Sequence, residues 1–288
     1  MKVYASVKMG CAQGKEHCDD RALVGDVILD SNSNTNMPDD DDNSVDSGIY
    51  EFDIDVNDTG KTFAVADGVG GTENGWFAAQ FGLTGIQMEL NNNDILDDGY
   101  IRNSIATINN TLNLTIKENI QIGDSASTLS LVKVFRDKIV YAQLGDSRIY
   151  LLTNSEGITV INRITTDQNN MRDWVSQGLY AGMDEEDIIK IPGAAHITGY
   201  LGAQPDRLEE MLEVGEINYH DGDVLIITSD GIHDYMKPTK MRKILASDMT
   251  PVEKIKALTE EALREGDEKR ASKDDQSIVY IELSNLRN

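Results

Sequence analysis

The sequence predicts an α+β fold in which antiparallel sheets carry helices on their outer faces. Segments of alternating hydrophobicity come first, helical periodicity follows a glycine cluster at 68–71, and strand patterns return before the last helices and a final strand. This order lacks the regular strand–helix alternation of a parallel sheet, so antiparallel pairing is expected. No repeat or linker divides the 288 residues, and we therefore expect one domain over 1–288.

The first part of the chain is predicted to contain several strands and one polar insertion. The strands, recognised by alternating or β-branched side chains, are expected at 3–8, 21–29, 49–56 and 61–67. The segment 30–48 is polar and low in complexity, so it cannot bury enough apolar area to order itself. It is expected to form a surface loop.

Two amphipathic helices are predicted next. In the first, Ala79, Leu83, Ile86 and Leu90 fall on one face at helical spacing. The segment 100–120 repeats this pattern with isoleucine and leucine side chains. Both helices are therefore expected to pack together or against a sheet.

The second half is predicted to open with a meander of three strands, in which Ser147 and Arg148 shape the second turn. The strands are STLSLVKVF, DKIVYAQLG and RIYLLTN. A mixed flap at about 165–200 follows, then strands in EINYH and DVLIITSD, two helices and a last strand at 276–283. The second helix is well marked, because Thr250 and Glu253 form a capping box and Gly266 is expected to lie past its end.

Composition narrows the classes of function. The chain has 50 acidic and 26 basic residues, a net charge of −24, which disfavours nucleic acid, anionic membranes and acidic peptides as partners. The two cysteines, Cys11 and Cys18, exclude a disulfide framework and give only a weak zinc signal. Because the chain shows neither a signal peptide nor an apolar run long enough to cross a bilayer, a cytoplasmic protein is expected.

Carboxylates gather where predicted strands begin or end, the places from which a rigid scaffold projects side chains into a cleft. These residues are Asp19, Asp20, Asp67, Asp230, Asp274 and Asp275. A single Asp-Gly pair is usually a turn, but several strand-terminal carboxylates together indicate a site for hard cations such as Mg²⁺ or Mn²⁺.

A calcium loop of the EF-hand type is a rival explanation that fails on the sequence. The window from Asp40 has Val45 at the required glycine position. The window from Asp53 has Asp58 at that position and Ala64 in place of the final glutamate.

Six short motifs follow one another along nearly the whole chain. They are CDDR (18–21), AVADGVGG (64–71), AQLGDSRIYLL (142–152), ITGYLG (197–202), LIITSDGIHDYM (225–236) and KDDQSIVYI (273–281). In this order the set resembles the metal-dependent protein phosphatases of type 2C, the PPM family, in its bacterial form. The resemblance implies a four-layer α-β-β-α sandwich. It also implies hydrolysis of phosphoserine and phosphothreonine on proteins by a hydroxide that bridges two Mn²⁺ or Mg²⁺ ions, with a third ion in some members.

The resemblance also implies roles for individual residues. Asp67 would bridge the two ions, and Asp20 and Asp230 would share the catalytic centre with it. The implied metal ligands are Asp20, Asp67, Gly68, Asp230, Asp274 and Asp19, with Asp146 and Asp234 for a third ion. Lys15 stands where the family often has a phosphate-binding arginine, which it can replace as a point charge without the bidentate geometry.

Proton donation to the leaving group is left unassigned. Val69 stands where eukaryotic members of the family often have a histidine that is proposed as general acid. His17 and His233 lie in or beside the motifs and are candidate donors, although an ordinary structural role is the simpler interpretation of each.

The leading hypothesis is a protein serine/threonine phosphatase that acts as a monomer on phosphorylated proteins and binds neither nucleic acid nor membrane. Two alternatives stay open. A catalytically inactive phosphatase fold would serve as a binding or regulatory module, but this would require lost metal ligands, and Asp20, Asp67, Asp230 and Asp274 are all present. A hydrolase of small phosphoesters would use the same metal chemistry.

Overall fold

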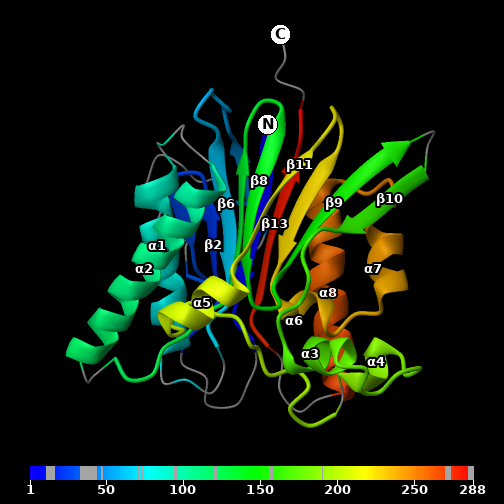
Figure 1. Cartoon of the computed structure of the whole chain (residues 1–288). Helices are drawn as coiled ribbons and strands as arrows, with labels where there is room; N and C mark the ends of the chain where they lie inside the picture. Colours follow the sequence, from blue (N-terminus) through cyan, green and yellow to red (C-terminus); the bar gives the residue numbers. More distant parts are fainter. Residues whose placement is uncertain are drawn as a thin grey trace.

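The computed structural model describes residues 1–10, 17–32, 44–46, 48–69, 72, 74–91, 93, 97–119, 122–155, 158–189, 191–269 and 274–284. In this part of the chain two antiparallel sheets pack face to face, and helices cover both outer faces (Figure 1). The predicted α-β-β-α sandwich is confirmed. Lys15, and residues 33–43 and 47 of the expected loop, lie outside the described residues.

The two sheets are built from strands that lie far apart in the sequence. The first sheet contains, in spatial order, β10 (Ile158–Arg163), β9 (Arg148–Ser155), β12 (Val224–Thr228), β13 (Gln276–Glu282), β1 (Lys2–Lys8), β5 (Ile49–Asp53) and β4 (Ser44–Asp46). The second contains β11 (Glu213–Asn218), β8 (Lys138–Leu144), β7 (Leu129–Val134), β6 (Lys61–Ala66), β2 (Arg21–Val24) and β3 (Val27–Leu29).

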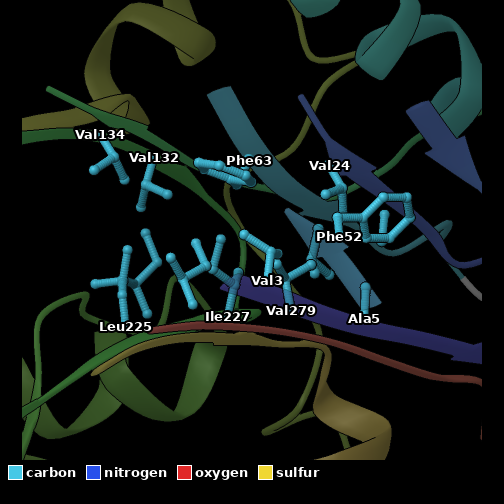
Figure 2. Packing of buried hydrophobic residues seen from close by; sticks show 14 of the residues in the cluster. Val3, Ala5, Val24, Phe52, Phe63, Val132, Val134, Leu225, Ile227 and Val279 are labelled. Atoms are coloured by element: carbon cyan, nitrogen blue, oxygen red, sulfur yellow. The ribbon is translucent and has the colours of Figure 1, made fainter. Parts of the chain in front are cut away.

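The central strands are apolar on both faces because each face is covered. In β6, Phe63 and Val65 point into the core between the sheets, whereas Ala64 and Ala66 contact the helical layer outside. Figure 2 shows Phe63 and its neighbours above the side chains of β12, β13 and β1, among them Ile227. Burying one large apolar side chain in this way stabilises the fold by about 1.5–3 kcal/mol.

Helices cover the outer faces, and shorter helices lie at one end of the sandwich, opposite the labelled chain termini (Figure 1). The second sheet is covered by α1 (Gly75–Leu90) and α2 (Asp98–Glu118), and the first by α7 (Pro238–Leu245) and α8 (Pro251–Lys269). The short helices are α3 (Asn170–Ser176), α4 (Glu185–Ile188), α5 (Pro205–Met211) and α6 (Asp230–His233). None of the described helices combines the length and apolarity that a bilayer crossing requires.

The predicted meander is wrong at its third strand. Strands β7 and β8 form a hairpin, but β9 leaves them and pairs with β12 in the other sheet. The residues Gly145 to Ser147 therefore carry the chain from one sheet to the other, with Gly145 at a φ of 94°. Alternating hydrophobicity identifies a strand but not the sheet that it joins, which is why the sequence did not predict this crossing.

Smaller differences concern edges and ends. The edge strand β10 and the helix α5 were not expected; β10 is largely exposed, so its sequence carries little apolar pattern. Within the expected loop, β4 pairs with β5. The capping box of α8 is confirmed, because Thr250 N–H donates to Glu253 Oε2 (2.8 Å) and Glu253 N–H to Thr250 Oγ1 (3.3 Å). Gly266 lies inside α8, which continues to Lys269.

Candidate active site

A cavity of about 770 Å³ opens at the end of the sandwich where the short helices lie. Its lining includes carboxylates from connections in both sheets, namely Asp19, Asp67, Asp146, Asp230 and Asp274. In the second sheet, Asp67 follows β6, Asp146 follows β8 and Asp19 precedes β2. In the first sheet, Asp230 follows β12 and Asp274 precedes β13. Packing of the two sheets is therefore what brings these side chains together.

Asp20 does not line the cavity, but its charge acts on Asp67. Asp20 is fully buried, and neither of its carboxylate oxygens has a hydrogen-bond partner among the described residues. Burial, and then the charge of Asp275, raise its pKa to about 7, which the nearby hydroxyls of Ser229 and Ser277 only partly oppose. One oxygen of Asp230 is likewise buried without a partner. Such oxygens are costly unless a proton or a cation satisfies them.

Asp67 lies close enough to four other carboxylates for their charges to act on it, and it is held by its backbone. Its N–H donates to Thr128 Oγ1 (3.0 Å), and its carbonyl accepts from Thr128 N–H (2.8 Å) and Ser127 Oγ (3.0 Å). Burial, followed by the charges of Asp20 and Asp230, raises the pKa of Asp67 well above its ordinary value. The side chain is thereby fixed in a position where its charge is strongly disfavoured without a counter-charge.

The glycine that follows each of two aspartates permits a close backbone approach. A Cβ at Gly68 would lie 2.4 Å from the carbonyl carbon of Gly75 at the start of α1. A Cβ at Gly231 would lie 1.8 Å from the carbonyl oxygen of Asp275. The two Asp-Gly pairs are therefore more than turns, because each glycine lets a second segment reach the site.

Asp275, whose role the sequence left open, is a scaffold residue. Its buried carboxylate accepts hydrogen bonds from the backbone N–H groups of Gly10 (2.6 Å) and Asp19 (2.5 Å). Asp19 in turn accepts from the Trp76 N–H at the start of α1 (3.1 Å). Asp275 therefore ties the residues before β2 to the start of β13, and Asp274 beside it lines the cavity.

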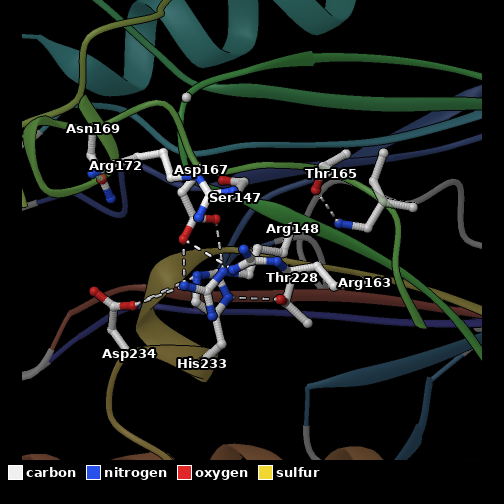
Figure 3. Close-up of polar contacts among 12 residues, drawn as sticks. Ser147, Arg148, Arg163, Thr165, Asp167, Asn169, Arg172, Thr228, His233 and Asp234 are labelled. Atoms are coloured by element: carbon white, nitrogen blue, oxygen red, sulfur yellow. Dashed lines mark hydrogen bonds and ion pairs between the residues drawn. The ribbon is translucent and has the colours of Figure 1, made fainter. Parts of the chain in front are cut away.

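Asp146 and Asp234 form a second acidic pair next to a buried ion-pair cluster, which Figure 3 shows together with Asp234. Arg148 donates from Nε and Nη2 to the two carboxylate oxygens of Asp167 (2.9 and 2.6 Å), and its Nη2 lies 3.9 Å from Asp234 Oδ1. Arg163 adds a third contact to Asp167 at 3.2 Å. Arg148 thus binds Asp167 and Asp234 instead of shaping a hairpin, and Asp167 is a residue that the sequence prediction missed.

Asp146 and Asp234 influence each other electrostatically. Burial, and then the charges of Asp234 and Asp167, raise the pKa of Asp146 to about 8, while Arg148 opposes the rise. Two of the eight predicted metal ligands do not line the cavity: Asp234 and the buried Asp20. The pair therefore forms a second acidic position beside the first.

Neither of the two candidate proton donors, His233 and His17, lines the cavity. His233 is buried, and its Nδ1 shares a hydrogen bond with Thr228 Oγ1 (3.0 Å). Burial, together with Arg148 and Arg163, lowers the pKa of His233 well below its ordinary value, so it stays neutral. His17 lies against the Trp76 ring. The histidine that does line the cavity is His196 of the flap, which the sequence did not single out.

The donor set fits hard divalent cations. It consists of carboxylate oxygens, which Mg²⁺ and Mn²⁺ prefer, and several of these oxygens are buried without partners. Within the described ranges, no three His, Cys, Asp or Glu side chains stand at the spacing of a ready-made metal site. The fit therefore rests on the chemistry and burial of the donors, and the role of each ligand remains a prediction.

Comparisons with known proteins agree with the geometry. The family model described as Protein phosphatase 2C matches residues 31–266. The phosphatase PhpP of Streptococcus pneumoniae is 25% identical over 210 residues, which cover 70% of this chain and 80% of that protein. The serine/threonine phosphatase Stp1 from Staphylococcus aureus has a TM-score of 0.71 at 20% identity, covering 98% of this chain and 94% of its own. The catalytic domain of PstP, solved in complex with two manganese ions, has a TM-score of 0.67 at 18% identity, covering 97% and 98%.

Proposed function

The chain belongs to the protein phosphatase 2C family, and from this membership we propose that it hydrolyses phosphoserine and phosphothreonine on proteins with the help of Mn²⁺ or Mg²⁺. The observation that carries the proposal is the convergence of carboxylates from both sheets. Asp67, Asp230 and Asp274 line one cavity, and the charge of the buried Asp20 acts on Asp67. The names of the relatives PhpP and Stp1 support it, as does the manganese complex of PstP.

Asp67, Asp20, Asp230 and Asp274 would hold two cations, with Asp19 and the Gly68 carbonyl beside them. Asp146 and Asp234 would hold a third. The bound cations would supply charge neutralisation for the phosphoryl group and an acidified water as the attacking group.

The chain's own residues contribute position and charge. Hydrogen bonds with Thr128 and Ser127 fix Asp67, and Asp275 fixes Asp19, so the carboxylates hold their places at little cost when substrate arrives. Lys15 would add a positive charge toward the phosphate. Val69 carries no proton to donate, so protonation of the leaving group falls to another group.

The inactive-module alternative receives no support from these residues, since every one of the four central carboxylates is present. The net charge of −24 disfavours nucleic acid as a partner. Because the site draws on residues from Asp19 to Asp274, we also propose that 1–288 act together as one catalytic domain and as a monomer.

Hydrolysis of p-nitrophenyl phosphate and of a phosphothreonine peptide tests the proposal. We expect turnover that requires Mn²⁺ or Mg²⁺ and is lost in Asp67→Asn, while the exposed Asp137→Asn, on the turn between β7 and β8, serves as the matched control and retains it. A wild-type protein that is inactive with every divalent cation would favour the binding module. Activity on the small ester alone would favour the small-phosphoester alternative.

A further inference from the structure

One wall of the cavity contributes none of the carboxylates discussed above. We call it the outer wall; it comprises Asn113 and Ile116 of α2, Asp124 of the segment before β7, and Ile197, Tyr200 and Gln204 near the end of the flap. A cavity of about 770 Å³ is in the range of whole ligand sites and is larger than a phosphate monoester alone requires. Next to the outer wall, the cavity therefore has room for the peptide chain of the substrate on either side of its phosphorylated residue.

Hydrogen bonds hold the outer wall in place. Asn109 and Asn113 of α2 both donate from Nδ2 to the Ala203 carbonyl (2.9 Å each), and Asn109 Oδ1 accepts from the Gly202 N–H (2.7 Å). Ser127 and Leu201 exchange backbone hydrogen bonds of 3.2 and 2.8 Å. A surface that is already ordered loses little entropy when a peptide binds to it.

The outer wall also lies close to the proposed catalytic centre. The Val69 N–H donates to the Ala126 carbonyl (2.9 Å), and Gly68 pairs with Ser127, so this segment runs beside Asp67. Asp124 is two residues before Ala126, and two residues span at most about 7 Å. A peptide residue one or two positions from the phosphorylated one covers a similar distance.

The charge of the cavity favours basic residues next to the phosphorylated residue of a peptide substrate. Asp124 is exposed and makes no hydrogen bond or ion pair to any described residue, and the described part of the lining contains no lysine or arginine. Ile116, Ile197 and Tyr200 are half-buried and offer apolar contact to the stem of a long side chain. An acidic residue of the peptide would be repelled by the like charge of the cavity, whereas a basic one would find the carboxylate of Asp124 unpaired.

We propose that the outer wall binds the residues that flank the phosphorylated serine or threonine, and that Asp124 selects a lysine or arginine among them. This inference rests on the proposed phosphatase function and names its preferred substrates. The net charge of the protein disfavours acidic peptides in general, whereas the inference assigns the preference for basic residues to one side chain, Asp124.

The test uses the full chain with Mn²⁺ and short phosphothreonine peptides. Each peptide carries a single Lys, Ala or Glu one or two residues before or after the phosphothreonine. The readout is the ratio of kcat/KM for the Lys and Glu peptides within each protein, with p-nitrophenyl phosphate showing that the carboxylate site works. We expect the wild type to prefer Lys at one or more positions by up to about fivefold, the range of an exposed ion pair.

Three variants make the test specific. Asp124→Asn should reduce the ratio toward one, and Asp124→Lys should invert it. The matched control Asp137→Lys makes the same change of charge at the far end of β7, about 20 Å away, and should keep the wild-type ratio.

Two results would overturn the inference while leaving the enzyme assignment intact. One is equal kcat/KM for Lys and Glu peptides at all positions in an active wild type. The other is a preference for Lys that persists in Asp124→Lys or that disappears equally in Asp137→Lys. A wild type that hydrolyses neither the peptides nor p-nitrophenyl phosphate would overturn the proposed function, and the inference with it.

Discussion

Stability in the absence of divalent cations should fall as the pH rises from about 5 to about 8, because the site carboxylates then lose their protons. The perturbation is chelation with EDTA across this range. In the folded protein the pKa of Asp20 is about 7, against an ordinary value of 3.8. The folded state thus binds this proton more tightly than the unfolded state does, so the free energy of unfolding decreases with pH between about 4 and about 7. Asp146, with a pKa of about 8, extends the window upward.

The magnitude follows from the same values. A rise of the Asp20 pKa from 3.8 to about 7 corresponds to on the order of 4 kcal/mol of lost stability once the carboxyl is fully ionised. No discount for solvent is needed, since Asp20 is fully buried. For a protein of this size a change of 4 kcal/mol lowers Tm by on the order of 10 °C.

Thermal unfolding followed by circular dichroism, with EDTA or with Mn²⁺ at each pH, measures the effect. Added Mn²⁺ should raise Tm more at about pH 8 than at about pH 5, where protons compete with the cation. Asp20→Asn should flatten the pH dependence in EDTA, whereas Asp137→Asn should preserve it, which separates the site from general repulsion among surface acids. A Tm in EDTA that is constant over the range would refute the reasoning, as would an equal Mn²⁺ effect at both ends.

Further predictions concern other parts of the site and the core. Arg148→Met should destabilise the fold by about 3–5 kcal/mol in urea unfolding, because it leaves the buried Asp167 with the weaker contact from Arg163 alone; a loss below about 1 kcal/mol would contradict the ion-pair account. Asp146→Ala should lower turnover while metal analysis still finds two bound ions, and loss of both would count against its assignment to a third. Lys15→Arg should lower KM for phosphopeptides through bidentate contact, and an unchanged KM would exclude Lys15 from phosphate binding. Phe63→Ala should cost about 3–5 kcal/mol in the same unfolding assay, and a cost near zero would be inconsistent with its place between the sheets.

Much of the fold could be predicted from the sequence because its signals are local. The alternation in β6, the stripe on α1 and the capping box at Thr250 are properties of neighbouring residues, and each is confirmed. The crossing of β9 into the other sheet depends on long-range pairing with β12, which no local pattern encodes. Gly266 shows the same limit, since a glycine near a predicted helix end did not end the helix.

The residues of the candidate site also fall into those that local sequence signals could predict and those that they could not. Asp residues at strand ends could be found because the strand pattern marks where each one stands, and the structure places Asp67 and Asp230 at one cavity. Asp167 could not be found, because its importance comes from Arg148, which lies 19 residues away and gives no periodic signal. The outer wall was missed for a related reason, since Asp124 stands in an irregular segment with no motif around it.

The placement of the carboxylates links the site to the stability of the whole sandwich. Asp67 and Asp146 come from the second sheet, and Asp230 and Asp274 from the first, so the repulsion of Asp67 by Asp230 and Asp274 acts against the packing of the sheets. Two or three fully buried side chains such as Phe63 and Ile227, at about 1.5–3 kcal/mol each, offset the cost of ionising Asp20, which is on the order of 4 kcal/mol and comes mainly from its burial. The inter-sheet core therefore keeps the carboxylates together before any cation binds. It follows that a cation gains its affinity by relieving repulsion in a fold that already exists, so binding should raise Tm without creating the fold.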